Sequence, residues 1–122
     1  MNPPPPFEFG IEHKLGEHEH LVDIPPGIST AELLLQIFYN HLELPGYFGF
    51  NWNALSDCLR DLHWVNHHVV IIRHADIPPI PREDLRTYVE ILAQAVLSWK
   101  PGDEHTLRVT FPADAKNYLA RL

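Results

Sequence analysis

Apolar and polar residues follow one another along this chain in two rhythms, a period of two that predicts strands and a period near 3.6 that predicts helices. Near the amino terminus, residues 7–11 and 18–24 alternate in short stretches, and each stretch therefore predicts a strand. Lys14, Gly16 and Glu17 between them favour a turn. We expect an N-terminal strand here, or a hairpin if the two stretches pair with each other.

A first helix is expected after the Pro25-Pro26-Gly27 break, because Ser29 to Glu32 form a capping-box pattern. In this pattern the Ser29 hydroxyl accepts from the Glu32 amide, while the Glu32 carboxylate reaches back. One broad and mainly apolar face then recurs at helical spacing: Leu34, Ile37, Phe38 and His41, flanked by Leu33 and Leu42. This broad face should lie in the core of the protein.

A second helix follows an aromatic loop, residues 44–50, with Asn51 as its expected cap and an end near Trp64. Four apolar residues at helical spacing should face inward: Leu55, Cys58, Leu59 and Leu62. The other side of the helix would carry Asn53, Asp57, Asp61 and Trp64, next to Tyr47, Phe48, Gly49 and Phe50 of the loop. The pattern predicts an acidic helix face beside exposed aromatic side chains.

The second half of the chain continues the alternation of strands and helices. The unbroken apolar run 69–72 is typical of a central strand covered on both faces, as in a parallel sheet. A helix starting near Pro81 keeps its apolar spacing through Val96, and residues 105–111 alternate like a closing strand. The order of elements indicates an α/β fold. We expect one domain, residues 7–122, after an extended, disordered Pro-rich tail, residues 1–6.

Composition narrows the classes of partner. The formal net charge of -7 disfavours a nucleic-acid surface and suits a basic protein partner, although nine histidines would reverse the sign if all were protonated. Proline pairs keep every apolar run shorter than a membrane span, and no signal sequence is evident. With a single cysteine, Cys58, no internal disulfide can form. We expect a soluble cytoplasmic protein that is monomeric when free.

Other chemistry is weighed and disfavoured. Cys58 beside His63 could suggest a nucleophile, but its position on the apolar stripe favours core packing. Asp57 with Glu43 could suggest an acid/base pair, yet no phosphate loop or nucleophile motif accompanies them. Six histidines could serve as metal ligands but are interpreted as solvated, because no cysteine or close carboxylate completes a ligand set: His13, His18, His20, His67, His68 and His74. We expect no metal, no cofactor and no enzymatic activity.

The stretch from Leu44 to Leu59, LPGYFGFNWNALSDCL, resembles the barstar-like ribonuclease inhibitors. That family pairs a Leu-Pro-x-Tyr-aromatic-Gly-x-Asn loop with an Ala-Leu-x-Asp-Cys-Leu helix, and the wider pattern agrees over roughly residues 21–111. The resemblance implies a small layered fold in which a short parallel sheet packs against helices, with the strand near Phe7 as an extension. It also implies an inhibitor or immunity protein that occludes the active site of a basic ribonuclease or nuclease toxin.

The same resemblance assigns residues to a partner-binding surface: Tyr47, Phe48, Gly49, Asn51, Asn53, Asp57 and Asp61. Asp57 would take the position of an RNA phosphate, and Tyr47 would lie against the catalytic groups of the nuclease. Family members often carry an acid where this chain has Asn53 and a tryptophan where it has Ser56, and Gln94 falls near another acidic position. Glu43, Asp61 and Asp84 could replace the missing charge. A histidine-dependent metal-binding regulator and an immunity protein for an unrelated toxin remain the alternatives.

Overall fold

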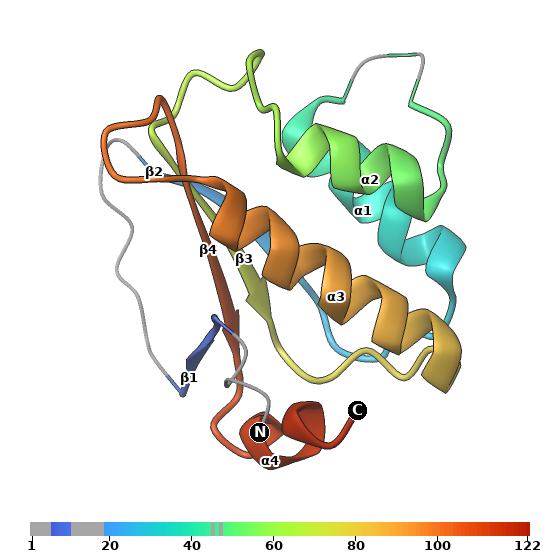
Figure 1. Ribbon diagram of the computed structural model, residues 1–122. Helices are drawn as coiled ribbons and strands as arrows, with labels where there is room; N and C mark the ends of the chain where they lie inside the picture. Colours follow the sequence, from blue (N-terminus) through green and yellow to red (C-terminus); the bar gives the residue numbers. More distant parts are fainter. Residues whose placement is uncertain (1–5, 11–18, 45, 47) are drawn as a thin grey trace.

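The unbroken apolar run 69–72 lies on an inner strand of a parallel sheet in a computed structural model that describes residues 6–10, 19–44, 46 and 48–122. Four strands and four helices are found in these ranges (Figure 1). The strands are β1 (Glu8–Phe9), β2 (Glu19–Ile24), β3 (Val69–His74) and β4 (Thr106–Phe111). The helices are α1 (Ala31–Leu42), α2 (Trp52–Leu59), α3 (Arg82–Ser98) and α4 (Ala115–Ala120).

All strands of the sheet run parallel, in the order β1-β4-β3-β2. Val70, Ile71 and Ile72 of β3 are almost fully buried, as expected of a strand with a neighbour on both sides. Figure 1 shows α1, α2 and α3 together on one face of the sheet. The predicted α/β fold, a short parallel sheet packed against helices, is therefore confirmed.

The core lies between the helices and this face of the sheet. It is built from the apolar stripes of the three helices and the inward residues of the inner strands: Phe38, Leu55, Leu59, Tyr88, Leu92, Val22, Ile24, Val70 and Ile72 are all fully buried. The opposite face carries cross-strand ion pairs, Arg73 with Asp23 and Arg108 with Glu8. No helix in the described part of the chain combines the length and hydrophobicity needed to cross a bilayer.

The predicted N-terminal strand exists, but the hairpin is wrong. Glu8 pairs with Thr110 and Phe9 with Phe111, so β1 lies at the opposite edge of the sheet from β2. Phe111 provides the reason, because the rings of Phe7 and Phe9 both pack against it, at centroid distances of 5.4 and 6.3 Å. Residues 11–18, which would have formed the turn, lie outside the described residues.

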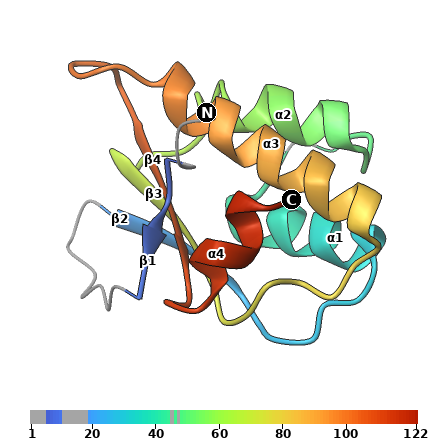
Figure 2. The same ribbon diagram turned by 60° about the horizontal axis from the view of Figure 1, so that its bottom comes forward.

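The short helix α4 was not predicted, and it lies beside β1 at the end of β4 (Figure 2). Gly10 joins the two elements: its amide donates to the Phe111 carbonyl at 2.9 Å, and its φ is +68°. A Cβ on Gly10 would lie 2.9 Å from the Cβ of Ala113, so only glycine fits here without a shift. The predicted division into tail and domain stays a prediction, since residues 1–5 also lie outside the described residues.

Two predicted helix boundaries need correction. The cap of α1 is Thr30 rather than Ser29, since the Thr30 hydroxyl accepts from the Leu33 amide at 3.1 Å and its own backbone is extended. Helix α2 ends at Leu59 rather than near Trp64. Leu62, three residues beyond this end, has a left-handed φ of 53°, which breaks the helical backbone, and its side chain remains fully buried.

His74 was interpreted as solvated, and this is wrong. The ring is buried, stacks on Phe111 at 3.9 Å, and lies between the Thr110 carbonyl at 2.9 Å and the Tyr88 hydroxyl at 2.6 Å. Because a carbonyl only accepts, Nδ1 carries the proton and Nε2 accepts from Tyr88. Burial lowers the pKa of His74 to about 4, so the ring is neutral near neutral pH.

Candidate functional site

The start of α2 is organised by Asn51, the residue expected to cap it. The Asn51 side-chain oxygen accepts from the Ala54 amide at 2.8 Å, and its Nδ2 donates to the Gly49 carbonyl at 3.3 Å. A single side chain thus satisfies a free amide of the helix and ties down the loop before it. The predicted cap is confirmed. Gly49 is exposed, and a Cβ there would come within 2.8 Å of Asn51 Nδ2.

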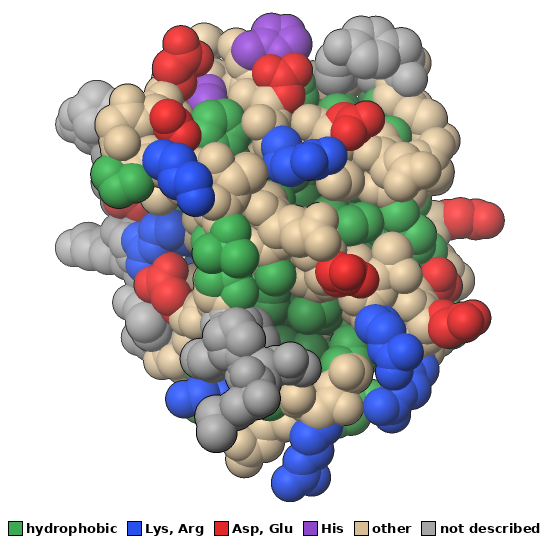
Figure 3. All heavy atoms as spheres, viewed as in Figure 1, with side chains coloured by type: hydrophobic (Ala, Val, Ile, Leu, Met, Phe, Trp, Pro, Cys, Tyr) green, Lys and Arg blue, Asp and Glu red, His purple; other side chains and the backbone are tan. Residues whose placement is uncertain are grey.

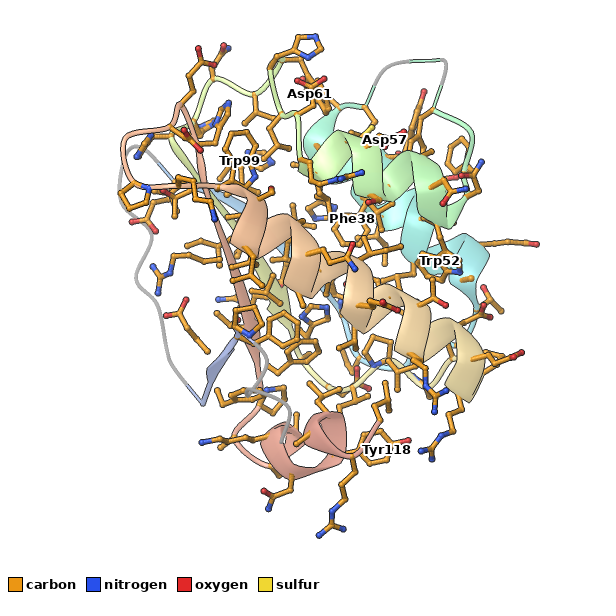
Figure 4. All side chains as sticks on the ribbon, in the orientation of Figure 1. Phe38, Trp52, Asp57, Asp61, Trp99 and Tyr118 are labelled. Atoms are coloured by element: carbon orange, nitrogen blue, oxygen red, sulfur yellow. The ribbon has the colours of Figure 1, made fainter. Side chains whose placement is uncertain are left out.

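The outward side of α2 carries Asn53 and Asp57, both exposed as predicted. The Asp57 side chain is 78% exposed, and its Oδ1 lies 3.3 Å from a guanidinium nitrogen of Arg60. Asp61 follows the helix, also exposed, and its Oδ2 lies 2.8 Å from Nδ1 of His63. Figure 4 shows Asp57 and Asp61 at the same end of the molecule, away from Phe38 in the core. We call the surface formed by Asn53, Asp57, Arg60 and Asp61 the α2 face.

The α2 face is mixed in charge rather than uniformly acidic. Figure 3 shows red carboxylates and a blue basic side chain interspersed over α2. Among the described residues, Arg60 contacts Asp57 and, through Nε, the Ser56 carbonyl, each at a long distance of 3.3 Å. An exposed pair of this kind contributes about 0–1 kcal/mol, so Asp57 can exchange it for another cation at little cost.

The aromatic loop differs from the prediction at Phe48. This side chain is buried, only 5% exposed, and its ring packs against Tyr39 of α1 at 6.2 Å and Phe50 at 5.0 Å. Phe50 is exposed as predicted, at 42%, and of the described aromatic residues of the loop it alone is exposed. Phe48 points inward because Tyr39 offers it an apolar contact at the end of α1. Tyr47, which was assigned to the partner-binding surface, lies outside the described residues.

The three tryptophans of the chain brace the region around α2, a role the sequence reasoning missed. The indole nitrogen of Trp52 donates to Asp84 at 3.4 Å, that of Trp64 to the Leu42 carbonyl at 2.9 Å, and that of Trp99 to the Leu59 carbonyl at 3.0 Å. Trp52 and Trp99 thereby tie the two ends of α2 to α3, and both are labelled in Figure 4. The sequence feature that could have indicated this role is the position of the tryptophans at the ends of predicted elements, because a buried indole usually finds a hydrogen-bond acceptor.

Several candidates are thereby placed away from the surface or in structural roles. Cys58 lies in the core, as predicted, and burial together with Asp57 and Asp61 raises the pKa of its thiol, which keeps it unreactive. Asp84 is half-buried and engaged with Trp52. Within the described ranges, no three His, Cys, Asp or Glu side chains come together in a way that could hold a metal ion.

A comparison with protein families gives one match that covers most of the chain. The model described as Barstar (barnase inhibitor) matches residues 20–112, from the beginning of β2 to the end of β4. No curated protein is significantly similar to the chain. The matched region contains the loop, α2 and the α2 face, whereas β1 and α4 lie outside it. The chain therefore belongs to the barstar family.

Proposed function

We propose that this protein binds a basic ribonuclease with its α2 face and occludes the active site of that enzyme, without catalysing a reaction itself. The proposal rests on the position of the Asp57 side chain. It stands exposed on a braced helix, inside the segment that matches a family of barnase inhibitors. A ribonuclease site must be positively charged to hold RNA phosphate, and a rigidly held carboxylate can occupy the same position.

Preorganisation of α2 supports this role. Binding costs free energy when a loop or side chain must be ordered, so a surface that is already fixed binds more tightly. Asn51 fixes the start of α2, and Trp99 fixes its last carbonyl. Asp57 therefore projects from a helix held at both ends, and a partner needs to order only its exposed side chain.

Electrostatics support a basic partner. A protein of formal net charge -7 attracts a cationic enzyme over a distance, which raises the association rate at low salt. At the contact, an arginine or lysine of the enzyme would replace Arg60 beside Asp57. The α2 face is less acidic than in family members that carry an acid at the position of Asn53. We therefore propose that the target is a basic ribonuclease, which can be one other than barnase.

We also propose the cytoplasm as the compartment and a monomer as the free form. The fold contains one cysteine, Cys58, which is buried and unpaired. A domain that is stabilised by core packing and contains no disulfide is suited to a reducing compartment. An inhibitor kept there would protect the cell from ribonuclease that has not been exported.

The proposal is tested by inhibition of a panel of basic ribonucleases that includes barnase, with the full chain as inhibitor. We expect inhibition that weakens as ionic strength rises from about 0.05 to about 0.5 M, over which the Debye length shortens several-fold. Asp57→Ala should weaken binding strongly, while Asp114→Ala, which removes an exposed acid at the remote helix α4, should not. The proposal fails if no enzyme of the panel is bound at low salt, or if both variants lose binding equally.

A further inference from the structure

A small pocket lies next to the α2 face and has no role in the proposal above. It has a volume of about 150 Å³ and is formed where the beginning of β2, the end of α1 and the connection from α2 to β3 meet. His20, His41, Glu43, Trp64 and His67 contribute to its lining. A cavity of roughly this size can enclose a ligand as large as benzene. The pocket thus has room for the end of one side chain.

Three hydrogen-bond donors around this pocket, on His20, His41 and Trp64, are already used within the protein. Nε2 of His20 lies 2.6 Å from the His41 carbonyl, and Nδ1 of His41 lies 3.1 Å from the Ile37 carbonyl. The indole nitrogen of Trp64 donates to the Leu42 carbonyl at 2.9 Å. Since a carbonyl oxygen only accepts, each of these nitrogens carries its hydrogen inside the protein. A neutral His20 or His41 then offers only an acceptor from its other ring nitrogen.

The charge of the residues that line the pocket also favours a ligand that donates hydrogen bonds, and one that is positively charged. Glu43 is exposed at the end of α1, where the helix dipole is negative, and its carboxylate forms no ion pair with the described residues. None of the lining residues, all of them in the described part of the chain, is a lysine or arginine. Trp64 adds an aromatic ring, which attracts cations to its face. Acceptors, a carboxylate and an aromatic ring favour a cation that brings several N–H donors.

The pocket is connected to the α2 face through His63, which contacts both Asp61 and the pocket residue Trp64. Asp61 contacts His63 at 2.8 Å, and the ring of His63 lies 5.0 Å from that of Trp64, at right angles to it. Figure 1 shows the connection after α2 at the same end of the molecule where Figure 4 places Asp61. A protein bound over Asp61 would therefore lie close to Trp64, on the wall of the pocket that Glu43 also lines.

We propose that this pocket binds a lysine or arginine side chain of the same basic partner, as a second anchor beside Asp57. This inference rests on the proposed function for the identity of the partner, but the preference of the pocket for a cation rests on its own lining. The three histidines and Glu43 face the incoming group from β2, α1 and the α2–β3 connection. A guanidinium, with its five donors, matches this set of acceptors best.

The pocket itself is tested with Nα-acetyl-arginine amide as the probe and its uncharged analogue, Nα-acetyl-citrulline amide, as the control ligand. Amide and indole NMR signals of the full chain are followed at neutral pH. We expect the arginine probe to shift the Trp64 indole and the signals of His20 and His67, with a Kd on the order of 1 mM. Citrulline should bind at least about ten-fold more weakly, because it lacks the charge that Glu43 attracts.

Glu43→Gln removes the carboxylate and keeps its size, and it should weaken binding of the arginine probe by about five-fold or more. Glu32→Gln is the matched control, because Glu32 is an exposed acid at the other end of α1. No shift at Trp64, equal binding of citrulline, or equal effects of the two variants would overturn the pocket as a cation site.

The link to the partner is tested separately with a ribonuclease that the chain inhibits. Glu43→Gln should weaken this complex by about five-fold, mainly through faster dissociation. Asp57→Ala should weaken the complex but leave binding of the arginine probe unchanged. If Glu43→Gln leaves the complex intact, the second anchor is wrong while inhibition through the α2 face stands. If no ribonuclease is inhibited although the probe binds, the proposed function fails and the cation pocket stands.

Discussion

The indole nitrogen of Trp99 donates a hydrogen bond of 3.0 Å to the carbonyl oxygen of Leu59, the last residue of α2. This contact links the end of α3 to the end of the helix that carries Asp57. The ring of Trp99 also packs edge-on against His105, at 5.4 Å. Helix α2 has only eight residues, too few to be stable alone, so its geometry depends on such contacts.

Trp99→Phe should destabilise the protein by about 1–2 kcal/mol, because the Leu59 carbonyl loses its partner while most of the aromatic packing remains. Urea denaturation followed by circular dichroism measures this change. Tyr118→Phe, at an exposed position of α4, should change the stability by less than about 0.5 kcal/mol. Equal midpoints for the Trp99 variant and the original chain would show that the indole hydrogen bond does not hold α2.

Asp57→Ala should leave the free energy of unfolding within about 0.5 kcal/mol of the original, since the side chain is 78% exposed. It should weaken ribonuclease binding by about 2 kcal/mol or more, roughly thirty-fold, a general value for interface hot spots to which the barnase–barstar complex itself contributes. Titration calorimetry and urea denaturation of the same preparation separate the two effects. A variant that is unstable, or that binds normally, would speak against Asp57 as the anchor.

Arg60→Ala should strengthen binding to a basic ribonuclease by up to about five-fold, because it frees Asp57 from its internal counterion and removes a like charge from the face. The gain should appear in the association rate and shrink as salt is added. Surface plasmon resonance at two ionic strengths measures it. Arg86→Ala, which removes an exposed charge from α3, is the control. Weaker binding of the Arg60 variant would mean that Arg60 contacts the partner directly.

The stability of the fold should fall as the pH drops from about 6.5 to about 4. The pKa of His74 is lowered from 6.5 to about 4, so between these values the unfolded chain binds a proton that the folded chain does not. Stability from this residue is thus complete above pH 6.5 and decreases by roughly 3 kcal/mol toward pH 4. Urea midpoints across this range should follow that slope. His68→Gln, at an exposed position, should retain it, and an NMR titration that protonates folded His74 near pH 6.5 would refute it.

Glu43→Gly should raise the stability by about 0.5–1 kcal/mol. The φ of Glu43 is 50°, a left-handed conformation that costs a residue with a Cβ more than it costs glycine, even after the greater chain entropy of glycine is subtracted. The same substitution inside α1, Glu32→Gly, should lower the stability by about 1 kcal/mol. Thermal unfolding of both variants makes the comparison. A loss of stability at both positions would show that the carboxylate of Glu43 contributes to the fold.

The sequence predicts well those parts of the fold in which buried residues recur at a regular spacing within one helix or strand. The apolar run in β3 and the stripe of Leu55, Cys58 and Leu59 are such cases, because each reports a local period. The two-residue strand β1 is different, since its pairing depends on Phe111, far away along the chain. The end of α2 was also missed. Leucine is disfavoured in the left-handed region, so the residue type of Leu62 does not predict its left-handed backbone.

The candidate site was predictable in part for the same reason. The exposure of Asn53 and Asp57 follows from helical periodicity once Asn51 is recognised as a cap. Phe48 was expected to be exposed together with Phe50. Its ring is buried instead, because it packs against Tyr39 of α1, a contact that depends on the tertiary structure. The cation pocket could not be foreseen, because it joins three segments that only the folded sheet brings together.

Strand β1, outside the region matched by the family, pairs with Thr110 and Phe111, the last two residues of β4. A sheet edge left open presents unpaired amides and carbonyls, on which a second copy of the same chain can add as a further strand. Glu8 and Gly10 thus also protect the end of this edge, because Glu8 holds the Arg108 side chain and the Gly10 amide pairs with the Phe111 carbonyl. A chain shortened up to Gly10 would keep the whole family region and the α2 face, and yet it should be more prone to aggregate.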